Sequence, residues 1–132
     1  MAGINDLTTL IKNMTPALNA GVYVFTTLLD AQNLPVDRIV ALIREPEGVS
    51  AILAEEDAQA LGIETRFRCA WITLTVHSAL EAIGLTAAFA TALGNAGISC
   101  NVVAGHYHDH IFVPLADAER AMLALQALQD DA

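Results

Sequence analysis

The chain has 132 residues, of which 55% are hydrophobic and only 16% charged, so it can build the core of one domain or of two very small ones. Its net charge is −9, and its six basic residues form no cluster, which argues against partners such as nucleic acid or an anionic membrane. We expect the weakly charged surface to be covered in part by further copies of the chain, in a homodimer or higher homo-oligomer.

The N-terminus and the cysteines predict a cytoplasmic protein. Residues 1–14 lack the basic segment and continuous apolar run of a signal peptide. No apolar run reaches the ~18 residues that a membrane span needs. Cys69 and Cys100 lie in apolar, strand-like stretches without CxxC spacing, as is typical of buried free thiols. A disulfide between them would require the two strands to be neighbours.

The first half of the chain predicts alternating helices and strands. Asn5 or Asp6 can cap a helix that runs to about Asn13 and that Pro16 ends. The β-branched and aromatic stretch 21–28 predicts a strand. Leu-Pro opens the segment 34–44, and its apolar spacing predicts a helix. A tight connection at 45–48, a strand at 49–53 and a short helix at 55–61 follow.

The second half begins with the clearest strand, residues 66–76, where side chains of two kinds alternate. The set with Trp71 and Thr73 suits a barer sheet face or a subunit contact. The other set is aliphatic and is expected to face helices; it comprises Ala70, Ile72, Leu74 and Val76.

The remaining elements follow from turn residues and helical spacing. A loop at 77–84 leads into a helix at 85–96, whose apolar residues recur at helical intervals. Strands are predicted at 99–105 and 110–114, with a turn between them. Asp117 is expected to cap a final helix that begins at Ala118.

The order of elements suggests a degenerate internal duplication. Two halves of similar length, 1–64 and 65–132, are both rich in strand–helix pairs. A ferredoxin-like unit has the order βαββαβ, and the second half lacks its last strand. We expect the first half to supply that strand, most simply as Val22–Leu28, so that the halves interlock.

Several short phrases carry a resemblance to a known family. They are Glu45-Pro46-Glu47-Gly48, Leu74-Thr75-Val76-His77-Ser78, Leu80-Glu81-Ala82-Ile83-Gly84-Leu85-Thr86, Gly97-Ile98-Ser99-Cys100-Asn101-Val102-Val103 and His108-Asp109-His110-Ile111-Phe112-Val113-Pro114. The pattern resembles the ACT-like domains, small modules that bind amino acids and related metabolites. More narrowly, it is similar to small stand-alone bacterial proteins with tandem ACT-like halves.

The resemblance implies an α+β fold, a ferredoxin-like sandwich with an antiparallel sheet, helices on one face and side-by-side pairing of units. It implies no catalytic activity and no cofactor. In such modules the ligand lies at the pairing interface, held by the loop after the first strand, the start of the first helix and the next strand. Carried onto this chain, the ligand-binding positions are His77, Ser78, Ala79, Leu80, Glu81, Ala82, Ile83, Gly84, Leu85, Asn101, Val102 and Val103.

Gly84 gives this site a physical basis. Glycine lets a ligand approach the backbone closely, and the free N–H groups of a first helical turn attract a carboxylate. Glu81 or Asn101 could then take an amino group. The common family loop has an acidic residue followed by Pro and Gly, whereas here Gly84 remains and Glu81 is its only acid.

His106, His108 and His110 offer a second candidate site. In one extended strand the outer two would be too far apart to share an ion. A turn at His108-Asp109 could bring them together with Asp109 as a metal ligand. We favour a hairpin turn without metal, in which Asp109 bonds backbone N–H groups. A metal site remains an open alternative.

The sequence gives little support for a catalytic site. His77 and Ser78 are adjacent and would diverge in direction, which makes a poor nucleophile–base pair. Glu45 with Glu47, or Glu55 to Asp57, could form acid pairs but are more typical of solvated charges at helix ends. The leading hypothesis is a non-enzymatic, amino-acid-binding regulatory protein. The alternatives are a structural or partner-binding oligomer without a ligand, and a His-rich metal-binding protein or hydrolase.

Overall fold

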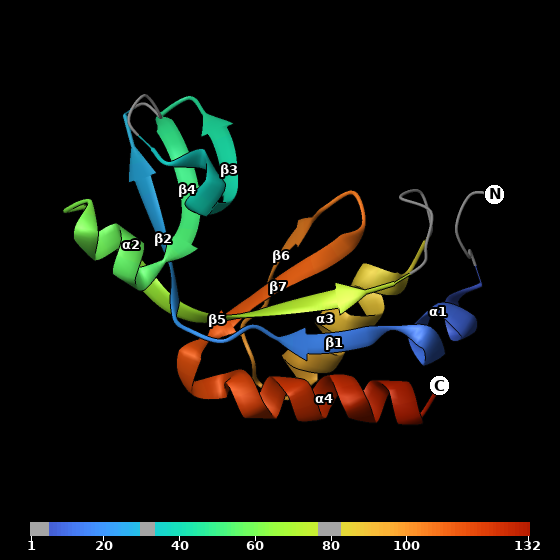
Figure 1. The fold of residues 1–132 in the computed structure, drawn as a ribbon. Helices are drawn as coiled ribbons and strands as arrows, with labels where there is room; N and C mark the ends of the chain where they lie inside the picture. The colour runs from blue at the N-terminus through green and yellow to red at the C-terminus, as the bar shows by residue number, and fades with distance from the viewer. Residues whose placement is uncertain (1–5, 30–33, 77–82) are drawn as a thin grey trace. The chain divides into compact units, whose positions relative to one another are not determined.

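The computed structural model describes residues 6–29, 34–76 and 83–132, which form two compact units (Figure 1). One unit is residues 20–69. The other combines the chain up to Asn19 with residues 70–132. Strand β5, Arg66–Thr75, contributes its first residues to one unit and the rest to the other. The predicted halves 1–64 and 65–132 describe a repeat along the sequence and stay a prediction.

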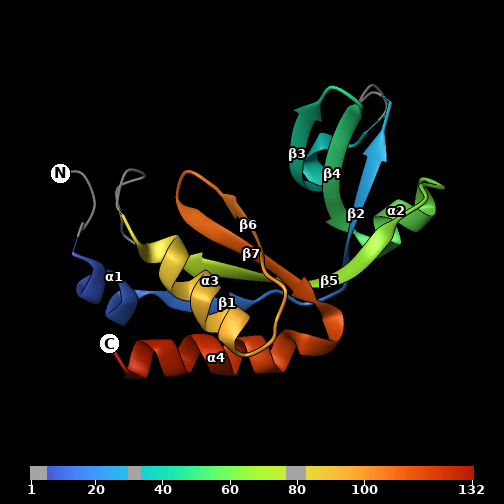
Figure 2. The ribbon, with the colours of Figure 1, turned by 180° about the vertical axis from the view of Figure 1, so that it is seen from behind.

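The discontinuous unit is an α+β sandwich whose sheet has the order β1-β5-β7-β6. Its helices pack on one face of that sheet, as the front and back views in Figures 1 and 2 show for α3. The elements are α1 Leu7–Asn13, β1 Thr15–Leu18, the end of β5, α3 Leu85–Asn95, β6 Asn101–Ala104, β7 His108–Pro114, the 3₁₀ turn η2 Leu115–Asp117 and α4 Ala118–Asp130.

The predicted alternation in β5 is confirmed. Its aliphatic residues, from Ala70 to Val76, are buried in one core cluster with Phe89 of α3 and Leu125 of α4. Phe89 and Leu125 are fully buried, and each such side chain contributes about 1.5–3 kcal/mol. Asp6 caps α1 as predicted, accepting a hydrogen bond from the Thr9 N–H at 3.0 Å. Asp117 precedes α4 but makes no capping bond, because its carboxylate pairs with Arg120.

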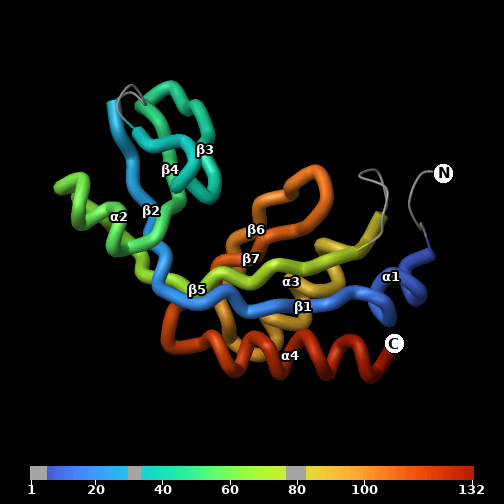
Figure 3. The backbone as a smooth tube through the Cα atoms, in the orientation of Figure 1, coloured from blue at the N-terminus to red at the C-terminus, as the bar shows by residue number. Residues whose placement is uncertain are grey.

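The missing strand does come from the N-terminal part of the chain, but it is β1 and not Val22–Leu28. Strand β1 runs antiparallel to β5, with Thr15 opposite Thr75 and Leu18 opposite Ile72 (Figure 3). The sequence pattern does not indicate β1, because Pro16 is equally typical of a residue that ends a helix. An edge strand also tolerates proline, since the missing N–H leaves no partner unsatisfied.

A glutamine on α4 ties the N-terminal segment to the helix layer. The side-chain amide of Gln129 donates to the carbonyl oxygens of Lys12 at 2.8 Å, Met14 at 2.5 Å and Ile11 at 3.3 Å. These carbonyls end α1 and precede β1, where a helix leaves its acceptors unpaired. Gln129 therefore satisfies the backbone where the chain changes from helix to strand.

The unit 20–69 has a sheet with the order β3-β4-β2-β5. Its core is small: Val24, Leu53 and Ala58 are buried together, with Ile39 and Ile63 packed against them. The elements are β2 Tyr23–Leu28, the 3₁₀ turn η1 Val36–Arg38, β3 Ile39–Glu45, β4 Gly48–Ala54, α2 Glu55–Ala60 and the start of β5.

The predicted helix at 34–44 is wrong. Only the single turn η1 is helical, and residues 39–45 form β3, an antiparallel partner of β4. A short apolar run fits either period, and here the β-branched residues and the hairpin partner decide for a strand.

The β3–β4 hairpin turns at Pro46 and Glu47, and Gly48 begins the return strand. Gly48 has φ +151°, and a Cβ there would lie 2.2 Å from the carbonyl oxygen of Leu28. Only glycine lets β4 approach β2 this closely. In the described residues, no helix is long and apolar enough to cross a bilayer.

Candidate functional site

The predicted ligand loop is described only from Ile83 onward; residues 77–82 lie outside the described ranges. Gly84 has φ +98° in the left-handed region and begins α3. Glycine offers no capping side chain, so the first N–H groups of α3 depend on water, the preceding loop or a ligand. A Cβ at Gly84 would lie 3.2 Å from Cδ2 of Leu7. Ile83 is 87% exposed and Leu85 is buried in the core.

The second predicted segment lies on the edge strand β6. Asn101 is exposed and faces Phe112 in the register, while Val102 and Val103 are half-buried. Among the described residues, no hydrogen bond links Asn101–Val103 to Ile83–Leu85. Leu85 belongs to the large core cluster and Val102 packs against the same cluster, and the ligand-binding role of the two segments stays a prediction.

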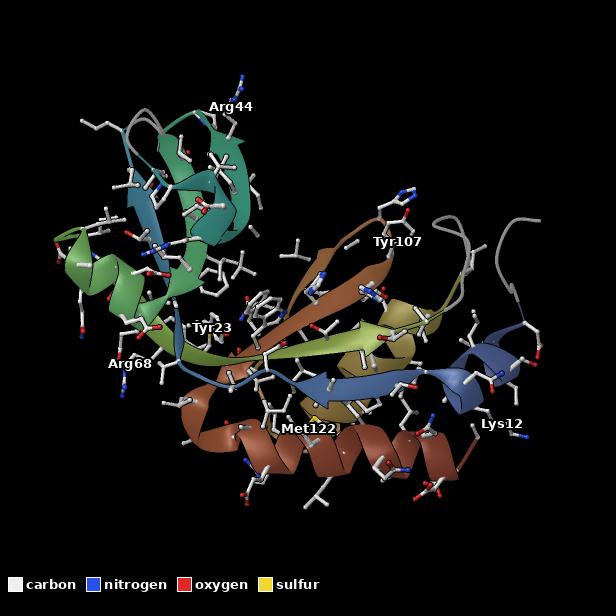
Figure 4. All side chains as sticks on the ribbon, viewed as in Figure 1. Lys12, Tyr23, Arg44, Arg68, Tyr107 and Met122 are labelled. Atoms are coloured by element: carbon white, nitrogen blue, oxygen red, sulfur yellow. The ribbon has the colours of Figure 1, made fainter. Side chains whose placement is uncertain are left out.

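The β6–β7 hairpin turns at Gly105–Tyr107, so the predicted turn at His108-Asp109 is wrong. The Gly105 N–H donates to the His108 carbonyl at 2.8 Å, and Asp109 already faces Ala104 in the strand pair. A Cβ at Gly105 would lie 3.0 Å from the His108 carbonyl oxygen and 3.1 Å from Nε2 of His110, which explains why glycine stands at this position. Tyr107, at the tip, is 77% exposed and projects away from the strands (Figure 4).

His108 and His110 lie on one face of β7, together with Trp71 of β5. We call these three residues the imidazole face. The indole N–H of Trp71 donates to Nδ1 of His110 at 3.0 Å, and its ring stacks near Phe112 at 6.3 Å. The two imidazole rings are 6.4 Å apart and nearly perpendicular. Nδ1 of His108 is buried and has no hydrogen-bond partner in the part of the chain that the structure describes.

This geometry fixes the protonation of His110. Because Nδ1 accepts the indole N–H, the neutral ring carries its proton on Nε2. Burial lowers the pKa of His110, the nearby His108 lowers it further, and Asp109 partly opposes both. Burial raises the pKa of Asp109, against the opposing effect of His110. The imidazole face therefore favours a neutral His110.

The other candidate groups are engaged elsewhere or buried. Within residues 6–29, 34–76 and 83–132 there is no cluster of three or more His, Cys, Asp or Glu side chains placed to hold a metal ion. Glu45 accepts a hydrogen bond from Ser50. Cys69 is a free thiol whose pKa burial raises to about 12, which leaves it unreactive at neutral pH. Cys100 is also free. His77 and Ser78 lie outside the described residues.

Sequence reasoning missed the contact between Trp71 and His110. The period-2 alternation placed Trp71 on the barer face, and the spacing of the histidines placed His108 and His110 together. The sequence pattern did not indicate that β5 and β7, which are far apart in the chain, are neighbouring strands in the sheet. The unusual residue types were the available signal, since the chain has a single tryptophan.

Comparison with known proteins gives two consecutive family matches. Residues 2–70 and residues 66–127 each match a family model described as an ACT domain. Among curated protein sequences, none matches this chain.

Solved structures with the same fold include both a close and several distant relatives. A Vibrio cholerae protein of unknown function, described as a possible transport protein, shares 48% identity over 93% of this chain and 95% of its own, with a TM-score of 0.83. An Agrobacterium tumefaciens protein shares 17% identity over 88% and 89% of the two chains, with a TM-score of 0.65. The regulatory subunit of aspartate kinase from Thermus thermophilus shares 12% over 86% and 95%, with a TM-score of 0.62.

Proposed function

Because the chain belongs to the ACT-domain family, with two matches in tandem, we propose that it is a cytoplasmic, non-enzymatic regulatory protein that binds an amino-acid-like metabolite. ACT domains are regulatory modules that generally bind amino acids. The observation that carries the proposal for this chain is Gly84, a left-handed glycine at the start of α3. It leaves the first helical turn open to an α-carboxylate.

We propose that the ligand lies at an interface formed by residues 77–85 and Asn101–Val103. Asn101 supports this position because it is exposed on an edge strand, where its amide can reach a ligand amino group. Val102 and Val103 would supply apolar contact beside it. Among the described residues β6 is an edge strand, and an edge strand can pair with another strand, so a paired copy could complete the site.

Isothermal titration against the twenty amino acids tests the proposal, and at least one saturable binding curve is expected. Gly84→Ala should abolish that binding, because a Cβ crowds the start of the helix. Gly97→Ala is the matched control: Gly97 also has a left-handed φ, +76°, but lies at the other end of α3. Flat traces for every amino acid with a folded oligomer would exclude amino-acid binding. Equal loss of binding in both variants would show that Gly84 acts only through folding.

We further propose that the protein works as a homodimer or higher oligomer. The edge strand β3 exposes large apolar side chains on both of its faces, with Leu42 41% and Ile43 51% exposed. Light scattering on the purified protein should give at least twice the 14.0 kDa of one chain. A monomer at concentrations that saturate ligand binding would rule out an interface site.

A further inference from the structure

A cavity of about 300 Å³ lies wholly within the unit 20–69, at the junction of β2, β4 and the start of β5. Its volume is near the lower limit for small-molecule sites. Because every lining residue belongs to one unit, the cavity needs no contribution from the other. The lining residues are Phe25, Thr26, Thr27, Ser50, Glu64 and Arg66.

A strained β-bulge directly follows Arg66, one of the residues that line this cavity. In the register of β2 and β5, Val24 faces Arg68 and Phe25 faces Arg66, which leaves Phe67 as an extra residue. Phe67 has φ +53°, a left-handed conformation that side-chain-bearing residues rarely adopt. Its ring packs 5.6 Å from that of Phe25. Bulges and strained residues of this kind are found where a strand re-aims a side chain beside a binding site.

The polar side chains of the cavity differ in whether they have a hydrogen-bond or ion-pair partner. The Thr26 hydroxyl donates to the Glu64 carbonyl at 2.7 Å, and the Ser50 hydroxyl donates to Glu45. Arg66 and Arg44 form no ion pair with any described residue, whereas Arg38, Arg68 and Arg120 each pair with a carboxylate. Of the two, only Arg66 lines the cavity. The cavity thus presents a guanidinium without an ion-pair partner among the described residues, beside an aromatic wall and with the Glu64 side chain on the same rim.

From this combination we propose that the cavity binds a small monocarboxylate with an apolar body. The carboxylate pairs with the two-pronged guanidinium of Arg66, and the apolar part packs against the ring of Phe25. The carboxylate of Glu64 on the same rim repels a second negative charge, which disfavours phosphates and dicarboxylates. This site shares no residue with the one proposed at Gly84, so either can fail without the other.

The probe is 3-phenylpropionate, compared with its neutral counterpart 3-phenylpropanamide, in an NMR titration of the full chain. The acid should bind at least about tenfold more tightly than the amide, because a charge-assisted pair is lost in the amide. Arg66→Gln should reduce the affinity for the acid to that for the amide. Arg44→Gln is the matched control, since Arg44 is an exposed arginine of the same unit that projects from β3 (Figure 4).

The variant Glu64→Gln tests the proposal through the direction in which the affinity changes. Removing the neighbouring negative charge should tighten binding of 3-phenylpropionate. Weaker binding in Glu64→Gln, with phenylalanine preferred over 3-phenylpropionate, would overturn the proposal in favour of a zwitterion site. Equal losses in Arg66→Gln and Arg44→Gln would reduce the effect to non-specific charge. Absence of saturable shifts at millimolar ligand would exclude the site.

Discussion

At the scale of single residues, the glycines differ sharply in what they permit. Gly48 has no room for a Cβ, whereas nothing lies within 4 Å of a Cβ built on Gly94 in α3. The first is fixed by the backbone of Leu28; the second is a weak point in a helix, where glycine costs conformational entropy.

Substitution by alanine should therefore have opposite effects at the two positions. Gly48→Ala should lower the free energy of unfolding by more than about 2 kcal/mol, because β4 must move away from β2. Gly94→Ala should raise it by up to about 1 kcal/mol. Urea denaturation followed by circular dichroism measures both. A Gly48→Ala protein as stable as the parent would show that the strands tolerate a wider spacing.

The imidazole face predicts a pH dependence of stability. His110 has a lowered pKa in the folded state, so the unfolded chain binds its proton more readily. The stability that a neutral His110 contributes is fully present above the ordinary histidine pKa of about 6.5. It is lost as the pH falls through the pKa of His110 in the folded state. Stability should decrease from pH 7 towards pH 5, and this slope should be reduced in His110→Gln.

Asp109 contributes with the opposite sign. Its pKa is raised in the folded state, so its contribution is present at low pH and is lost as the pH rises through the folded pKa. Asp109→Asn should therefore be more stable than the parent at pH 7, with the difference shrinking towards pH 4. Denaturation curves across this range separate the two residues. A difference that grows on acidification would contradict the assignment.

At the scale of elements, Gln129 is expected to hold the N-terminal segment in place. Gln129→Ala removes the donor to three carbonyls and should cost about 1–2 kcal/mol, with faster amide exchange around β1. Gln126→Ala is the control, because Gln126 bonds only the exposed Asp130 one turn away and should change stability by less than about 0.5 kcal/mol. Equal exchange rates in the two variants would show that β1 is held by sheet pairing alone.

The sequence predicted those elements whose local pattern agrees with their tertiary surroundings. The alternation in β5 and the helical spacing in α3 and α4 were sufficient, because each carries an unbroken apolar face. It did not predict β1, a short edge strand containing Pro16, or β3, whose apolar residues fit two periods. Strand β1 depends on its pairing with β5, which is distant in sequence, and β3 depends on its hairpin partner β4. No local pattern encodes either pairing.

The candidate sites also differ in whether the local sequence could indicate them. Gly84 was singled out through the family resemblance and because a glycine at a helix start lets a ligand approach the backbone, and its role in binding stays a prediction. The cavity at Arg66 was not found, since it needs the register of β2 with β5 and the bulge at Phe67. The tautomer of His110 likewise follows only from the position of Trp71.

At the scale of the whole molecule, the two units have very unequal cores. Every member of the large core cluster lies before Asn19 or after Cys69, whereas the unit 20–69 has a cluster of three buried residues. Small chains bury too little surface to fold alone. The discontinuous unit should therefore be the independently stable one.

Excision of residues 20–69 tests this directly. The Asn19 N–H donates to the Trp71 carbonyl at 2.9 Å, so the two ends of the discontinuous unit are already hydrogen-bonded neighbours. A short Asn-Gly turn can join them as a hairpin of β1 and β5. The shortened protein should unfold cooperatively and show dispersed amide resonances, while the isolated fragment 20–69 should not. A shortened chain without dispersed resonances would show that the core needs the second unit.

The contact between Trp71 and His110 also gives this protein an optical property. Trp71 is the only tryptophan, so all indole emission comes from a ring that is hydrogen-bonded to an imidazole and stacked near Phe112. Protonation of His110 removes the acceptor, and a molecule that covers this face changes the solvent around the indole. Emission colour and intensity should therefore follow both acid titration and occupancy of the sheet face, with no label added to the chain.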